Sequence, residues 1–163
     1  MGATAWLHAG PLVIVACGAT KLEHPAPAGE LYIGSYHRAC RSAAVRLTCP
    51  SRLRILSARA GLLPLDAVAP YDVRAGSVGA VDAVKLRHQA RRQLLLDELE
   101  VIVLGGRTYA DLVRHVWPHA LWPLAGTHGI GEQLARLAAI ARSPRPASVV
   151  ADLVRSHPDA LSA

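Results

Sequence analysis

Four short apolar runs each end in a loop that carries glycines and reactive side chains. The runs are Val13–Ala16, Leu53–Ser57, Val101–Leu104 and, more weakly, Ala120–Pro123. A thiol and an amine follow the first run at Cys17 and Lys21, and the paired glycines Gly105 and Gly106 follow the third. If the runs are parallel strands, these loops meet at one sheet edge, where open α/β sheets bind ligands. The pattern predicts a small enzyme with a single site at that edge.

Asp72 is the carboxylate that we consider first as a catalytic group. Pro70 has a fixed φ angle, so Tyr71 and Asp72 are held more rigidly than most loop residues. An aromatic ring can stack on a base or sugar while a neighbouring carboxylate accepts a proton or stabilises an oxocarbenium-like centre. In the alternative interpretation, Tyr71 is buried and Asp72 is a turn residue. Glu30 and Asp66 are the second choices for the base or nucleophile.

The first and third loops contain groups that suit an anion. Cys17, near Lys21, could act as a thiolate nucleophile, although a small residue that merely closes a strand is the simpler interpretation. Lys21 is better explained as an anion ligand. Gly105 and Gly106 stand where a strand turns into a helix, and the free amides of a first helical turn bind phosphate. Arg107 beside them favours that role, although a tight turn alone would also select glycines.

The sequence predicts neither a metal nor an organic cofactor. The eight histidines are scattered, and the three cysteines lack the spacing of a zinc site. The glycines from 126 to 131 stand in the reverse order of a dinucleotide fingerprint, without its acidic partner. The net charge of +6, from 18 basic and 12 acidic residues, suits phosphorylated or polyanionic partners. We expect a cytoplasmic protein without a membrane span, which would need about 20 apolar residues.

Helical periodicity alternates with the apolar runs. Predicted helices cover residues 35–47, 82 to about 99, 108–117 and about 130–141, and a short helical tail covers 146–163. Segment 23–29 is predicted to be a surface loop because of its two prolines, and a second loop of about twenty residues follows the second run. We therefore expect one domain with its core at about 12–142. Its fold class is a three-layer α/β sandwich, with about four mostly parallel strands and helices on both faces.

Several of these segments resemble a known family. They are VACGATKLEHPAPAGELYIGSYHRAC, ILSARAGLLPLDAVAPYD, VLGGRTYADLV and PLAGTHGIG, within residues 12–131. The family is a largely uncharacterised group of small bacterial and phage α/β proteins with CGxxK, LYxG, LSAxxGL, PYD and GxxY motifs. It is distantly similar to YaaA-like proteins and to a domain of archaeosine synthase. Ala19 and Thr20 stand where its members are more polar, which lowers the charge of the first loop.

The resemblance implies nucleobase or nucleic-acid chemistry, in agreement with the basic charge. We therefore expect an enzyme that hydrolyses or exchanges the N-glycosidic bond of a nucleoside, nucleotide or modified nucleobase. Its predicted catalytic residues are Asp72, Glu30, Tyr71 and Cys17. Its predicted ligand-binding residues are Gly18, Lys21, Tyr32, Ser57, Gly105, Gly106, Arg107 and Tyr109.

Two alternatives belong to other functional classes. The first is a protein that binds nucleic acid without catalysis, through arginines and lysines crowded at 38–54 and 85–92. Solvated helix faces would give the same pattern. The second is a scaffold that has lost the chemistry and forms a homodimer through exposed leucines at 62, 63 and 65.

Overall fold

The computed structural model describes residues 10–68 and 79–161. Within them lies one sheet of four strands, in the order β3-β2-β1-β4. The strands are β1 (Leu12–Ala16), β2 (Leu53–Ser57), β3 (Gly61–Leu63) and β4 (Val101–Leu104). The pairs β1–β2 and β1–β4 are parallel, whereas β3 is antiparallel to β2. The predicted α/β fold with a mostly parallel sheet is confirmed.

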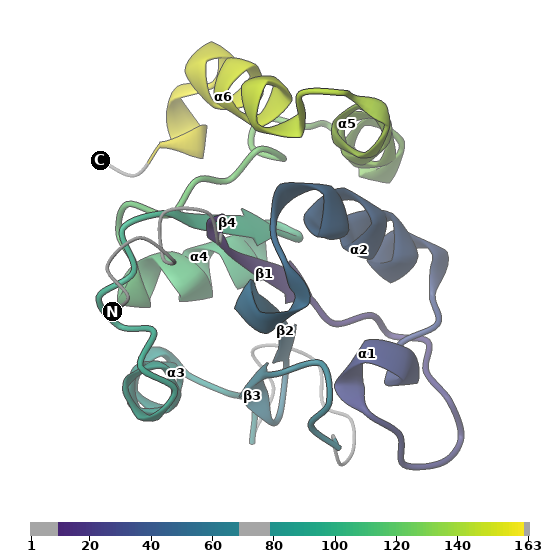
Figure 1. Cartoon of the computed structure of the whole chain (residues 1–163), viewed down its shortest axis with the longest axis vertical. Helices are drawn as coiled ribbons and strands as arrows, with labels where there is room; N and C mark the ends of the chain where they lie inside the picture. The colour runs from purple at the N-terminus through teal and green to yellow at the C-terminus, as the bar shows by residue number, and fades with distance from the viewer. Residues whose placement is uncertain (1–9, 69–78, 162–163) are drawn as a thin grey trace, which may run out of the picture.

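The central strands consist of apolar residues because both faces of the sheet are covered. Every residue of β1 and of β4 is buried. Figure 1 shows α2 (Ser35–Leu47) on one side of the sheet, and α3 (Ala83–Arg92) and α4 (Arg107–Val116) on the other. Beyond β4, α5 (Ile130–Arg142) packs on α2, and α6 (Pro146–Ser156) packs on α5. The shorter helices are α1 (Ala28–Leu31), η2 (Pro50–Arg52) and η3 (Pro158–Ala160).

The prediction of a fourth strand at Ala120–Pro123 is wrong. This segment passes beside β4 but forms only one bridge, between Leu121 and Ile102. The Trp122 amide is on the side away from β4 and donates to the carbonyl of Ala160 at 3.1 Å. The pairing cannot continue because the next amide on the β4 side would be that of position 123, where proline has no N–H to donate.

The fourth strand of the sheet is β3, which lies inside the segment predicted to be a long loop. Its outer edge is protected by two glutamines of α3. Gln89 Oε1 accepts a bond from the Leu62 amide at 2.9 Å, and Gln93 Nε2 donates to the Leu62 carbonyl at 2.8 Å. These contacts satisfy an edge that would otherwise be open to another chain. Leu62 is 2% exposed, and Leu63 and Leu65 are part-buried, so the prediction of three exposed leucines is also wrong.

The predicted helix from 82 to about 99 is shorter than expected. Asp82 caps α3 as predicted, since its side chain accepts a bond from the Lys85 amide at 2.8 Å. The helix ends at Arg92, and Leu94 adopts a φ of 57°. This left-handed residue changes the direction of the chain, so Leu94 is 89% exposed and Leu95 enters the core in its place.

The other helix predictions agree with the structure within one or two residues. Helices α2, α4 and α5 lie where the periodicity places them, and α6 begins at Pro146 after the predicted break. The predicted loop at 23–29 does not extend that far, because α1 begins at Ala28 behind Pro27. Among the described helices, none combines the length and apolar composition that crossing a membrane would require.

Candidate functional site

The ends of β1 and β4 bring together two of the loops that the sequence analysis singled out. Cys17 Sγ, directly after β1, lies 3.2 Å from the hydroxyl oxygen of Tyr109 on α4. The two strand ends approach so closely that a Cβ at Gly105 would lie 2.6 Å from Cβ of Ala16. Only glycine fits there. The structure thus places Cys17, Gly105 and Tyr109 in one neighbourhood at the carboxyl edge of the sheet.

The N-terminus of α4 opens onto the same edge. Gly106 is its N-cap and provides no side-chain hydrogen bond, so the first amides of the helix are not capped by a side chain. A Cβ at Gly106 would meet nothing within 4 Å, so there is open space beside the N-cap. The guanidinium of Arg107 lies 5.2 Å from the ring centroid of Trp122, whose Nε1 donates to the Gly105 carbonyl at 2.9 Å. The first amides of α4 and the Arg107 guanidinium could together hold an anion in the open space beside Gly106.

The loop between β1 and α2 is folded back on itself. Lys21 and Tyr32 form an antiparallel bridge, which the bonds from Leu22 to Leu31 and from Ile33 to Thr20 extend. This backbone pairing brings the two predicted ligand-binding residues side by side. Tyr32 is 7% exposed, so most of its ring is packed against the protein.

Glu30 and Ser57 differ from the residues just described. Glu30 is exposed on α1, and its carboxylate has no hydrogen bond or ion pair among the described residues. Ser57 is 3% exposed, and its hydroxyl oxygen accepts bonds from the amides of Ala60, at 3.1 Å, and Arg59, at 3.4 Å. The hydroxyl therefore builds the turn between β2 and β3. Tyr71 and Asp72 lie outside the described residues, and their catalytic roles stay predictions.

His37 is a residue of this neighbourhood that the sequence analysis did not select. It is 1% exposed, and its Nδ1 lies 2.8 Å from the carbonyl oxygen of Ala16, the last residue of β1. Its ring centroid is 5.3 Å from that of Tyr32. Burial lowers the pKa of the imidazole below its ordinary value of 6.5. The helical spacing of His37 with Cys40 and Ala44, both buried, was the available signal.

The side chain of Arg136 holds the loop that follows the bridge at Leu121. Arg136 is 9% exposed, and its Nη1 donates to the carbonyls of Pro123, at 3.0 Å, and Ala125, at 2.6 Å. Its Nη2 also lies 3.2 Å from His157 Nε2. The arginine therefore satisfies the backbone of this loop, which has a structural part in the fold.

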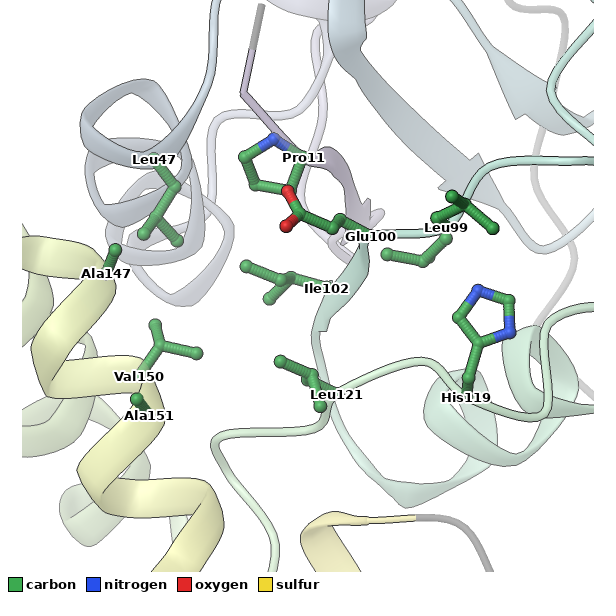
Figure 2. Close-up of a pocket in the computed structure, with 11 residues that line it drawn as sticks. Pro11, Leu47, Leu99, Glu100, Ile102, His119, Leu121, Ala147, Val150 and Ala151 are labelled. Atoms are coloured by element: carbon green, nitrogen blue, oxygen red, sulfur yellow. The ribbon is translucent and has the colours of Figure 1, made fainter. Parts of the chain in front are cut away.

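A cavity of about 390 Å³ lies at the opposite, amino edge of the sheet, beside β4. Figure 2 shows aliphatic side chains that point into it from α2, β4, α6 and the bridge segment, namely Leu47, Ile102, Val150 and Leu121. The carboxylate of Glu100 and the imidazole of His119 stand at its rim. His119 Nε2 already bonds to the Glu98 carbonyl at 2.8 Å. The cavity is therefore mainly apolar, and little in it would orient a polar ligand.

Comparisons with known proteins identify a family but no characterised relative. Searches among curated proteins and among solved structures find no match to this chain. A family model matches residues 12–139, which include β1, β2, β4 and the neighbourhood of Cys17, Gly105 and Tyr109. The chain belongs to that family, which is described as a family of unknown function (DUF6884).

Proposed function

We propose that the protein is an enzyme that binds a nucleoside or nucleotide at the carboxyl edge of its sheet and hydrolyses or exchanges the N-glycosidic bond. The contact between Cys17 and Tyr109, beside the open N-terminus of α4, is the observation that supports this proposal most. It joins the ends of two adjacent parallel strands, which is where open α/β sheets bind ligands. The resemblance to YaaA-like proteins and to archaeosine synthase, itself a prediction, favours a nucleobase.

The chemistry divides between an anion-binding part and a reacting part. The amides at the start of α4, with Arg107, hold the phosphate, and Tyr71 stacks on the base, because most of the Tyr32 ring is packed against the protein. A carboxylate, Asp72 or Glu30, takes a proton from the attacking group, which is water in hydrolysis or the incoming base in exchange. The attacking oxygen or nitrogen forms a bond to the anomeric carbon as the bond to the departing base breaks, and the proton on the carboxyl group passes to the departing base.

A panel of nucleoside 5′-monophosphates tests the proposal, with chromatography to detect free base and calorimetry to measure binding. Gly106→Asp places a carboxylate at the proposed phosphate position and weakens binding by about tenfold or more through charge repulsion. Gly129→Asp is the matched control because Gly129 is the N-cap of α5, where a Cβ also meets nothing within 4 Å. Aspartate is a favourable N-cap, so both variants should fold.

Asp72→Asn separates binding from chemistry in the same assay. The expected result is loss of base release with nucleotide affinity retained. Absence of both binding and base release across the panel would refute the proposed function. Equal affinities of Gly106→Asp and Gly129→Asp would remove α4 from the site.

Nucleic-acid binding is the second candidate, and the structure favours α3 over α2 as its location. Two arginines of α2 donate to carbonyls elsewhere in the chain, Arg41 to that of Gly29 and Arg46 to that of Ser143. A groove of about 330 Å³ between α3 and α4 is instead lined mainly by basic and imidazole side chains, which are Arg87, His88, Arg91 and His115. Only Ala83 and Val84 in its lining are apolar.

A gel-shift titration at two salt concentrations tests this candidate. Binding should fall steeply with salt, because counterions are released from the phosphates. Arg91→Ala with Arg92→Ala should weaken it, whereas Arg38→Ala with Arg142→Ala, on other helices, should not. Absent or salt-insensitive binding rejects the candidate.

A further inference from the structure

His37 is a buried imidazole that contacts both halves of the carboxyl-edge site. Its Cβ lies 3.2 Å from the position that a Cβ at Gly18 would occupy, so it supports the loop after β1. Its ring lies against Tyr32, at 5.3 Å between centroids and tilted by 50°. His37 stands in the first turn of α2 and thus connects Gly18 on one side with Tyr32 on the other.

The hydrogen bond of His37 determines which ring nitrogen carries the proton. A carbonyl oxygen can only accept, so Nδ1, at 2.8 Å from the Ala16 oxygen, is the donor. In the neutral ring, Nε2 is then left with a lone pair. Burial disfavours the charged ring, so the neutral form is the one that fits here.

The Nε2 atom is buried and has no hydrogen-bond partner among residues 10–68 and 79–161, which the structure describes. Buried polar atoms without partners are uncommon, because each gives up its hydration without compensation. Packing alone would therefore favour an apolar residue at this position. The imidazole costs stability through Nε2, while its Nδ1–H holds the end of β1.

We propose that His37 is a positioning residue of this site: its Nδ1–H holds the Ala16 carbonyl, and with it Cys17 and Gly18, while its ring supports Tyr32. It acts through these residues, because the imidazole is itself buried away from any ligand at the edge. The proposal rests on the proposed function insofar as the site binds a nucleotide. Its structural part, the placement of the loop, does not depend on the ligand.

Two substitutions separate positioning from packing. His37→Leu removes the bond to Ala16 and also removes the unpaired Nε2. His37→Asn retains a side-chain donor that can reach the same carbonyl. His128→Leu is the control, because His128 is exposed at the loop before α5.

The three variants are compared with the wild type by thermal unfolding, by calorimetry with nucleoside monophosphates, and by amide NMR. We expect His37→Leu to unfold near the wild-type temperature but to bind about fivefold more weakly, the equivalent of one hydrogen bond. The amide signals of Cys17 and Gly18 should move in this variant. His37→Asn should bind within about twofold of the wild type, as should His128→Leu.

Three outcomes would overturn the inference, and they are distinguishable from one another. If the wild type binds and His37→Leu binds equally well, His37 has no positioning role and the proposed function stands. If affinity falls only in proportion to a loss of folded protein, the role of His37 is packing. If the wild type binds no nucleotide, the proposed function fails, and unmoved amide signals of Cys17 and Gly18 in His37→Leu would then overturn the structural part of the inference.

Discussion

The two ends of the sheet differ in the chemistry of their side chains. At the carboxyl end, a thiol, a phenol and the open N-terminus of α4 adjoin one another, above a buried imidazole. At the amino end, a cavity of about 390 Å³ is lined mainly by aliphatic side chains. Of the two polar side chains in its lining, that of His119 already bonds to the Glu98 carbonyl.

The comparison teaches that volume and chemistry need not coincide. Binding sites combine apolar walls with a few polar groups that converge on one point. The carboxyl edge has the converging groups, and the amino-edge cavity has the volume. We therefore place the proposed reaction at the carboxyl edge and interpret the cavity as imperfect packing between β4 and α6.

The largest expected effect on stability comes from adding a side chain at Gly105, where the ends of β1 and β4 lie close together. Gly105→Ala places a methyl group 2.6 Å from Cβ of Ala16, so one of the two strands must shift. We expect a loss of about 1–3 kcal/mol in the free energy of unfolding, measured with urea. Gly106→Ala, next to it in open space, should cost less, about 0.5–1 kcal/mol, the difference between glycine and alanine at an N-cap. Equal losses in the two variants would show that the strand ends are not in close contact.

The next effect concerns pH and the buried His37. The pKa of His37 in the folded state is below its unfolded value of 6.5. Well above pH 6.5 the ring is neutral in both states, so it does not make the free energy of unfolding depend on pH. Below pH 6.5 the unfolded chain takes up the proton first. Stability then falls as the pH falls, by at most about 1.4 kcal/mol per pH unit from this group.

Urea titrations between pH 7 and pH 5 measure this dependence. His37→Leu should lose less stability than the wild type over that range, since it has no buried imidazole to protonate. His128→Leu should behave like the wild type. A parallel decline of wild type and His37→Leu would show that other groups control the pH dependence.

The smallest effect tests whether the amino-edge cavity is a packing defect. Ala151→Leu adds an aliphatic side chain to the cavity lining and should stabilise the protein by about 0.5–1 kcal/mol without changing nucleotide affinity. Ala139→Leu, on an exposed position of α5, controls for the difference in helix propensity. A loss of nucleotide affinity in Ala151→Leu alone would show that the nucleotide binds in the amino-edge cavity and not at the carboxyl edge.

Local patterns predicted the elements that carry their own signals. The apolar runs of β1, β2 and β4 are visible in the sequence because parallel strands are buried on both faces. Helix α2 agrees with its predicted bounds, since its buried residues recur at helical spacing. In contrast, β3 forms because its backbone bonds to β2 and to two glutamines that are distant in the sequence. No local pattern reveals such partners.

The candidate site likewise contains residues that the sequence predicts and one that only the tertiary structure reveals. Residue types and strand ends were sufficient to select Cys17, Gly105 and Tyr109, because parallel strands bring their carboxyl ends to one edge. The sequence does not predict a role for His37, because its contacts with Ala16, Gly18 and Tyr32 form only when α2 packs against β1.

The sequence by itself determined the α/β class, the three parallel strands and the edge at which their reactive side chains gather. Each of these follows from short-range periodicity and from the direction of the strands. Only the tertiary structure decided that β3 completes the sheet, that Leu94 turns outward and that the buried imidazole of His37 bonds to the end of β1. These features depend on contacts between segments far apart in the chain, whose free energies no local pattern contains.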